Sequence, residues 1–284
     1  MWRIVFMLAC SAVASAAEPL PEILWHRPDY PPTFILSGPW KDQGFGDRRE
    51  LDLIKALSGY RHRRMPSNVS RLMQEYQLRA NVCTTALLKT AEREQRVIYS
   101  EPVLEQLPNG LITLLKYKAD FEPFLNERGE VKLAALVQSG KVRISVAADR
   151  SYGATIDAAL QAGHQSGAVR AFFKGDIFAS GLQRLGQQGE VDATLGMAIE
   201  MNWVIGRLGL PEKEYWFVPI AGETGLVRTY VACSRGTQGQ AIIDEVNRLL
   251  RTTGMRAEFA HAYMEWLPEN LRSHYRQVRA GTVR

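Results

Sequence analysis

The charged segment TAEREQRVIYSEPV, residues 90–103, contains the side chain best suited to binding chemistry. It places Glu92, Arg93, Glu94 and Arg96 directly after a short apolar run. A guanidinium is always charged and offers paired N–H donors in one plane, which suits the binding of a carboxylate. Two interpretations are open: Arg93 contacts a ligand, or it forms a surface ion pair with Glu92 or Glu94.

A second candidate is DRSYGAT, residues 149–155, which lies between an expected strand and an expected helix. Backbone N–H groups at a helix start have no partner in the helix and can hold an anion. Arg150 would add positive charge. The N–H groups that we expect there belong to Ser151, Tyr152 and Gly153. The alternative is ordinary helix capping by Ser151 or Thr155.

Several rings and an acid follow the first expected strand. Asp29, Tyr30, Phe34 and Trp40 would supply the walls of a binding cleft, Tyr30 and Phe34 above all. The alternative for any single ring is the core or the surface.

Catalytic and cofactor motifs are missing. The sequence has no G-x-S-x-G, no H-E-x-x-H and no Walker loop, and its 5 histidines lack metal-ligand spacing. GFGDRR, which begins at Gly44, lacks the third glycine of a dinucleotide loop. We therefore expect no cofactor and no metal, and favour a binding protein over an enzyme.

The composition is that of a globular protein. The 284 residues are 46% apolar and 23% charged, and 35 basic against 30 acidic residues give a net charge of +5. That charge is mild and spread along the chain, so we expect no nucleic-acid partner. The locally basic RHRR, residues 61–64, is interpreted as solvated surface, as is the basic C-terminal tail.

Residues 1–17 are typical of a secretory signal peptide. A charged Arg3 precedes an apolar run, and small residues lead to cleavage after Ala16 or Ala17. The alternative is a lipoprotein signal ending at Cys10. Either interpretation predicts an exported protein.

Cleavage leaves Cys83 and Cys233 as the only cysteines. An oxidising compartment and an even count favour a disulfide, which by loop length alone would contribute about 5 kcal/mol at most. Two separate buried thiols are the alternative.

Apolar runs alternate with helical patterns along the chain. The pattern at residues 47–59 predicts a helix, with Asp47 and Glu50 in capping-box spacing, and TFIL at residues 33–36 reads as a strand. Strands separated by helices predict an α/β protein with mostly parallel sheets.

Four stretches in this order resemble the type II periplasmic solute-binding proteins, in particular solute-binding protein family 3, the amino-acid-binding branch. They are DYPPTF, KTAEREQRVIYSEPV, GQQGEVDATLG and IIDEVNRLLRTTGMRAEFAHAYMEWL, at residues 29–34, 89–103, 186–196 and 242–267.

The resemblance implies two lobes that close on a ligand by hinge motion. Lobe 1 would hold residues 18–113 and 222–284 and lobe 2 residues 114–221, with crossovers near Leu111–Tyr117 and Ile220–Val227. It also implies a periplasmic monomer whose partner is a membrane permease or a sensor kinase. Cys83 and Cys233 would be neighbours in lobe 1, which favours the disulfide.

In the resembling family the arginine that matches Arg93 binds the ligand's carboxylate, and the YSEP that follows would pack a turn against its helix. Ala86 and Leu88 replace a glycine and a hydroxyl residue of the family pattern, and Met197 replaces an acid that neutralises the ligand's ammonium.

Asp29 or Glu200 would have to replace that acid, unless Glu200 is an ordinary exposed helix residue. A carboxylate-bearing molecule, a modified amino acid or a peptide-like compound therefore fits better than an ordinary amino acid. Two alternatives differ in class. One is an enzyme resembling cyclohexadienyl dehydratases, with Asp29 and Glu200 as acid–base groups. The other is a degenerate interaction module.

Overall fold

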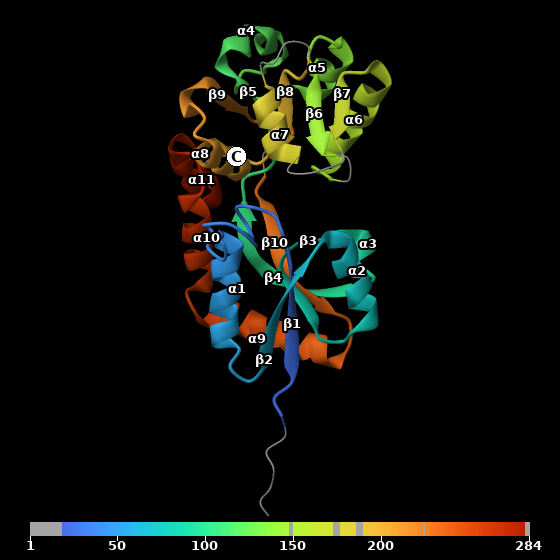
Figure 1. The fold of residues 1–284 in the computed structure, drawn as a ribbon, viewed down its shortest axis with the longest axis vertical. Coiled ribbons are helices and arrows are strands. Elements are labelled where there is room, and N and C mark those ends of the chain that lie inside the picture. Colours follow the sequence, from blue (N-terminus) through green and yellow to red (C-terminus); the bar gives the residue numbers. More distant parts are fainter. Residues whose placement is uncertain (1–18, 148–149, 173–176, 186–189, 224, 282–284) are drawn as a thin grey trace, which may run out of the picture.

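The computed structural model describes residues 19–147, 150–172, 177–185, 190–223 and 225–281. The signal peptide predicted at residues 1–17, with Cys10, lies outside these ranges, as does Asp149 at the start of the second candidate site. The described chain forms two lobes, each built around one sheet of five strands (Figure 1).

The lobe 1 sheet has the strand order β2-β1-β3-β10-β4. Strand β1 runs parallel to β2 and to β3, and β10 runs antiparallel to both β3 and β4. The bounds are β1 Glu22–Pro28, β2 Arg61–Ser67, β3 Val82–Leu88, β4 Val97–Gln106 and β10 Val227–Ser234.

The lobe 2 sheet has the order β7-β6-β8-β5-β9. Here β6 runs parallel to β7 and β8, while β5 runs antiparallel to β8 and β9. The bounds are β5 Gly110–Leu114, β6 Ile144–Ala147, β7 Val169–Phe172, β8 Ala193–Gly196 and β9 Tyr215–Val218. The predicted two-lobed α/β fold is confirmed, but both sheets are mixed rather than mostly parallel.

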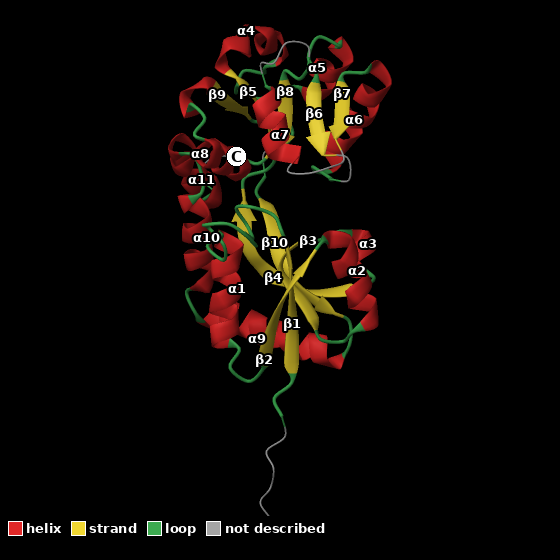
Figure 2. Ribbon diagram, in the orientation of Figure 1, coloured by secondary structure: helices red, strands yellow, loops and turns green. Residues whose placement is uncertain are grey.

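Helices flank both sheets (Figure 2). Lobe 1 carries α1 Phe45–Ala56, α2 Val69–Leu78, α3 Ala91–Glu94, α9 Thr237–Thr252, α10 Met255–Glu265 and α11 Glu269–Arg279. Lobe 2 carries α4 Lys118–Phe121, α5 Leu133–Ser139, α6 Ala154–Ser166, α7 Ile177–Arg184 and α8 Ala198–Leu208. Within the described ranges no helix has both the length and the apolar character needed to span a bilayer.

Alternating strand residues divide each core between the two faces of its sheet. In β3, Val82 packs with the α2 side chains Leu72 and Tyr76, whereas Cys83 packs with α1 and α9. In β5, Leu111 faces α5 and α6, whereas Ile112 faces α7 and α8. Each sheet is therefore buried on both faces, as the apolar strand sequences require.

The chain crosses between the lobes twice. Strand β4 ends at Gln106 in lobe 1 and β5 begins at Gly110 in lobe 2, so the first crossover is residues 107–109. The prediction of Leu111–Tyr117 is wrong, because the apolar run GLITL is already a lobe 2 strand and not the connection. The second crossover lies between the end of β9 and the start of β10, at residues 219–226.

Helix α8 of lobe 2 also packs against lobe 1. Ala198 and Ile199 at its N-terminus are buried in the main core of lobe 1, together with Tyr263 of α10. Asn202 Nδ2 donates to the carbonyl of Trp266 at 3.0 Å, and the Trp203 and Trp266 ring centroids are 5.5 Å apart. The N-terminal half of α8 therefore ties the two lobes together on one side (Figure 1).

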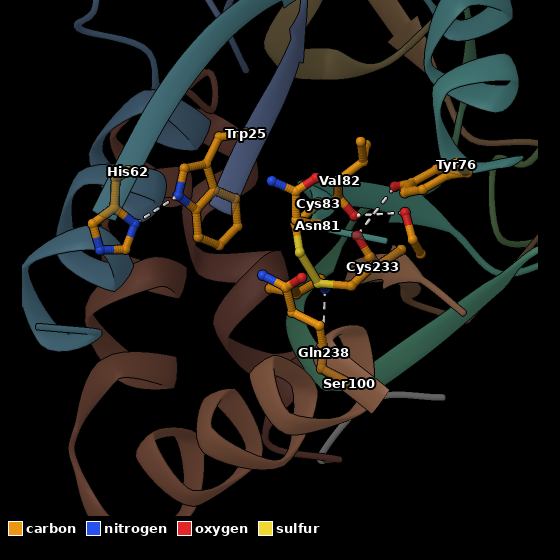
Figure 3. Close-up of a disulfide and its surroundings, with 12 residues drawn as sticks. Trp25, His62, Tyr76, Asn81, Val82, Cys83, Ser100, Cys233 and Gln238 are labelled. Carbon is orange, nitrogen blue, oxygen red and sulfur yellow. Dashed lines mark hydrogen bonds between the residues drawn. A yellow bond between two sulfur atoms is a disulfide. The ribbon is translucent and has the colours of Figure 1, made fainter. Parts of the chain in front are cut away.

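Cys83 and Cys233 form a disulfide between β3 and β10, so the predicted pairing is confirmed (Figure 3). The two residues lie directly opposite each other in the antiparallel register and are fully buried. Beside them the Tyr76 hydroxyl donates to the carbonyl of Ala232 at 3.1 Å. The bridge joins strands 150 residues apart in sequence and connects the N-terminal and C-terminal parts of lobe 1.

Two strands were not expected from the sequence. RHRR belongs to β2, an edge strand in which Arg61 and Arg63 are exposed, as expected, whereas Arg64 is half-buried and bound to Glu50, so the interpretation as solvated surface is wrong for Arg64. The YSEP that was expected to form a turn lies inside β4, the opposite edge of the sheet. An edge strand tolerates Pro102, because one side of its backbone has no neighbouring strand to pair with.

Two local predictions near the N-terminus are also wrong. TFIL at residues 33–36 forms only an isolated bridge between Tyr30 and Phe34. Helix α1 begins at Phe45 with Gly44 as N-cap, so Asp47 is its third residue rather than its cap. Its carboxylate bonds to backbone and arginine partners outside the helix, which the capping-box spacing does not reveal.

Candidate functional site

A cavity of about 1130 Å³ lies between the lobes. It opens at the carboxyl ends of β1, β3, β6, β7 and β8, where ligands bind in open α/β sheets. Lobe 1 contributes side chains between residues 28 and 40 and between 86 and 93, together with the first part of β10, and lobe 2 contributes Ala147, residues 150–152 and one face of α8. The predicted site residues on its wall are Asp29, Tyr30, Phe34, Arg93, Ser151, Tyr152 and Glu200; Gly153 is not among the lining residues.

The loop that presents Tyr30 and Phe34 is held by one buried carboxylate. Asp47 Oδ2 accepts hydrogen bonds from the N–H groups of Ile35 at 2.9 Å and Gly44 at 3.1 Å. A Cβ at Gly44 would collide with backbone oxygens of this loop. Gly44, the first glycine of GFGDRR, therefore permits a close backbone contact that positions the loop carrying Tyr30 and Phe34.

A cluster of charges lies behind this loop. Arg27 bonds to Asp47 and to Asp42, the latter at 2.6 Å, and Arg64 Nε lies 2.7 Å from Glu50 Oε1. Burial raises the pKa of Glu50 to about 7, although Arg64 and Arg27 both act to lower it. The ionised form of Glu50 is thus stabilised only in part, and the cluster responds to pH near neutrality.

Arg93 reaches the cavity from the lobe 1 side. Thr90 caps the short helix α3 by accepting a hydrogen bond from the Arg93 N–H at 3.2 Å, and Arg93 Nη1 donates to the carbonyl of Leu88 at 3.0 Å. Among the described residues no carboxylate oxygen lies within 4.0 Å of its guanidinium. Its acidic neighbours pair elsewhere, Glu94 with Lys89 and Glu92 with Arg96. The ion-pair alternative for Arg93 is therefore not observed.

Arg150 reaches the cavity from the lobe 2 side and is fully engaged. Its Nη1 lies 2.7 Å from Glu200 Oε1, and its Nη2 lies 3.0 Å from both Glu200 Oε2 and Asn109 Oδ1. The guanidinium carbon is 4.8 Å from the Tyr152 ring centroid and 5.4 Å from that of Tyr30. Burial disfavours its charge, but Glu200 and Tyr30 outweigh burial and raise the pKa of Arg150.

Tyr30 belongs to lobe 1 but contacts the charged groups of lobe 2. Burial raises the pKa of its phenol well above the ordinary value; Arg150 opposes that rise and Glu200 adds to it. The phenol therefore stays protonated throughout the physiological range. This contact is a link across the cleft between the two walls.

Glu200 is not the exposed helix residue that one interpretation of the sequence proposed. It is 3% exposed, and besides Arg150 it accepts a hydrogen bond from the Met197 N–H at 2.7 Å. Because Met197 is the N-cap of α8, Glu200 closes the start of its own helix. Its oxygens are occupied, so it offers no open acid to a ligand's ammonium. Asp29 is exposed and accepts only a long hydrogen bond, 3.3 Å, from the Leu36 N–H.

The anion cradle predicted at Ser151, Tyr152 and Gly153 is wrong for two of its three N–H groups. Asp157 Oδ1 accepts from the Tyr152 N–H at 2.9 Å, and the Ser151 hydroxyl accepts from the Gly153 N–H at 3.4 Å. The Ser151 hydroxyl itself donates to Asp157 Oδ2 at 2.6 Å. Capping thus comes from Asp157 inside the helix, and neither Ser151 nor Thr155 acts as the N-cap residue.

Sequence reasoning missed the Arg150–Glu200 pair and the role of Asn109. One signal was available: β6 and β8 are adjacent parallel strands, so the residues just beyond their carboxyl ends meet at one edge. Within the described residues no group of three or more histidine, cysteine or acidic side chains is placed to hold a metal ion. The cleft thus combines Arg93, which has no carboxylate partner among the described residues, Arg150, which is neutralised by Glu200, the exposed Arg207 of α8, and a wall of rings.

No family model matches the sequence, and no curated protein matches it either. Solved structures do match its fold. One, from work on glutathione import in Gram-positive bacteria via GshT and the cystine ABC importer TcyBC of Streptococcus mutans, has a TM-score of 0.63 at 12% identity and covers 89% of this chain and 99% of its own. The probable amino-acid ABC transporter extracellular-binding protein YtmK of Bacillus subtilis matches with a TM-score of 0.61 at 14% identity, covering 89% and 100%.

The periplasmic VFT2 domain of Bordetella pertussis BvgS matches with a TM-score of 0.59 at 15% identity, covering 87% of this chain and 94% of the domain. The chain therefore has the type II periplasmic-binding-protein fold, and amino-acid ABC transporter substrate-binding proteins are among its structural neighbours. The resemblance read from the sequence is confirmed at the level of the fold.

Proposed function

We propose that this protein is an exported solute-binding protein that captures a small carboxylate-bearing ligand between its lobes. The observation that carries the proposal is the Arg93 guanidinium, which lines the cavity and has no carboxylate partner among the described residues. A forked, permanently charged donor in a partly buried site is matched to a carboxylate.

The size and lining of the cavity support a ligand larger than a small amino acid. Ligand pockets commonly measure about 300–1,000 Å³, and this cavity, at about 1130 Å³, is slightly larger than that range. Its walls carry many apolar and aromatic side chains, including Ile35, Trp40, Leu87, Leu107, Phe172 and Trp203. A modified amino acid or a peptide-like carboxylate fits this lining, and glutathione and cystine, which are linked to the structural neighbour from Streptococcus mutans, are of that size class.

Hinge closure follows from the two crossovers and the walls on separate lobes. A ligand that contacts both walls would favour the closed form, and a transporter or a sensor kinase would recognise that form. The neighbours from ABC importers and from BvgS support both kinds of partner. We place the mature protein in the periplasm.

The geometry disfavours the two alternatives, an enzyme and a degenerate interaction module. An enzyme on this scaffold would use Asp29 and Glu200 as acid–base groups, but Glu200 is ion-paired to Arg150 and Asp29 is exposed. A degenerate module would not maintain a large ordered cavity with an unpaired guanidinium on its wall. We therefore propose binding without catalysis.

A thermal-shift screen of carboxylates and short peptides tests the proposal. A ligand held only by the folded state raises the melting temperature, and Arg93→Ala is expected to remove that rise. Arg96→Ala is the matched control, because Arg96 is close in sequence but pairs with Glu92 and does not line the cavity. An unchanged response in Arg93→Ala would contradict the proposal, and a hit that is consumed with time would indicate an enzyme.

A further inference from the structure

The Arg150 guanidinium occupies a site whose walls are built to hold a cation. Two oxygens of Glu200 and the amide oxygen of Asn109 accept its N–H groups at 2.7–3.0 Å. The faces of Tyr30 and Tyr152 lie near its guanidinium carbon, at 5.4 and 4.8 Å. A carboxylate fork together with aromatic faces is the usual protein environment for an organic cation.

This site is part of the ligand cavity and not of a separate core. Each of its members, Tyr30, Asn109, Arg150, Tyr152 and Glu200, also lines the space between the lobes. Lobe 1 contributes one ring and lobe 2 contributes the other, so the site closes only when the lobes are in contact. The cation that fills it is a side chain of the protein itself.

The parts of this site hold one another in place without a ligand. Glu200 is anchored by the Met197 N–H, and Asn109 Nδ2 donates to the carbonyl of Tyr152 at 3.0 Å. The Tyr152 hydroxyl accepts from the Ala147 N–H at 2.9 Å. An anchored carboxylate that is 3% exposed requires a cation nearby, because a buried unpaired charge is strongly unfavourable.

A ligand with a positive group would be opposed in this part of the cavity. Among the described lining residues the carboxylates are Asp29 and Glu200. Glu200 is already neutralised, and Asp29 is exposed on the other lobe. An ammonium placed beside Tyr152 would lose its water and find no free acid, because Arg150 already pairs with both oxygens of Glu200, and this uncompensated cost discriminates against that ligand.

We propose that Arg150 is a built-in occupant of a cation-binding subsite and sets the specificity of the cleft. The subsite takes guanidinium and ammonium groups when Arg150 is removed. The second half of the inference rests on the proposed function: the native ligand is a carboxylate that carries no positive charge at the Arg150 end.

The first test empties the subsite. In Arg150→Ala, ethylguanidinium is expected to raise the melting temperature at pH 8 by several degrees, whereas its neutral isostere ethylurea is not. Wild-type protein and the double variant Arg150→Ala with Glu200→Gln are the controls, and neither should respond to the cation. An equal response to ethylguanidinium and ethylurea in Arg150→Ala, or no response to either, would overturn the subsite. This test does not involve Arg93, so it is independent of the carboxylate proposal.

The second test needs no variant and remains available if Arg150→Ala does not fold. Titration calorimetry compares 3-(4-methylphenyl)propionate with 3-(4-aminomethylphenyl)propionate, which differ by one ammonium group at the end away from the carboxylate. Wild-type protein is expected to bind the uncharged-ended compound at least about tenfold more tightly, given the cost of burying an ammonium that has no free acid to pair with. Equal or tighter binding of the aminomethyl compound would contradict the specificity claim and leave the proposed carboxylate site standing. Binding of neither compound would count against the ligand class, and the ethylguanidinium result would still decide the subsite.

Discussion

Arg93 on the lobe 1 wall of the cleft and Arg150 on the lobe 2 wall differ in what surrounds them. Arg93 on lobe 1 makes one side-chain bond, to a backbone carbonyl, and has no acidic partner among the described residues. Arg150 on lobe 2 has a buried carboxylate, an amide oxygen and two rings around it. This difference is why we propose Arg93, and not Arg150, as the group that binds the ligand's carboxylate.

The largest expected effect is a difference in the free energy of unfolding between a variant on the lobe 2 wall and a variant on the lobe 1 wall. Glu200→Ala leaves Arg150 as an uncompensated, mostly buried charge and is expected to lower the free energy of unfolding by about 3–5 kcal/mol. Arg93→Ala removes no ion pair and should change it by less than about 0.5 kcal/mol. Denaturant unfolding of the two ligand-free variants measures the contrast. Similar losses of the free energy of unfolding in both variants would contradict the claimed difference between the paired Arg150 and the unpaired Arg93.

The next effect concerns the disulfide that stabilises the lobe 1 wall of the cleft, where Arg93 lies. Cys83 and Cys233 join β3 and β10, both of which line the cavity, and they are the only cysteines among the described residues. Replacing both by alanine is expected to lower the free energy of unfolding by about 2–4 kcal/mol, since the unfolded chain regains the entropy of a long loop. Unfolding of the double variant is compared with wild type in the absence of reductant.

Two checks go with this prediction. Mass spectrometry of the mature wild-type chain should show it two protons lighter than the thiol form. Wild type measured with reductant should approach the double variant. If the reduced and oxidised proteins unfold together, the bridge does not stabilise this wall.

The smallest effect tests the charge cluster behind the ring-bearing loop. Burial raises the pKa of Glu50 to about 7, so the folded protein holds this proton more tightly than the unfolded chain does. The stability that Glu50 contributes is full below its unfolded pKa and is lost as the pH rises through the folded pKa. Between pH 5 and 7 this loss is about 2 kcal/mol.

Glu50→Gln isolates that contribution. The free energy of unfolding of wild type minus that of the variant should fall by the same amount over this range, as followed by denaturant titration at several pH values. Taking the difference between the two proteins cancels His26, whose pKa is lowered chiefly by burial and which titrates in the same region. A difference that does not vary with pH would show that Glu50 is ionised throughout.

Local pattern was enough for much of the fold. The alternation of apolar strands and helical patterns predicted an α/β protein, and the division into two lobes was implied by the resemblance. It failed where edge strands carry charge or proline, as in β2 and β4, because an edge strand does not need a continuous apolar sequence. The pairing of Cys83 with Cys233 came from the order of the lobes and not from any local signal.

The candidate site also depends partly on local sequence and partly on tertiary contacts. The sequence by itself determined which residue types stand at the carboxyl ends of the strands, including Arg93 and the rings at residues 30 and 34. Only the tertiary structure decided which of those groups are free, because their partners are distant in the chain: Arg150 and Glu200 are 50 residues apart. Hydrogen bonding and charge neutralisation are properties of groups in contact, and periodicity along a chain describes faces and not contacts.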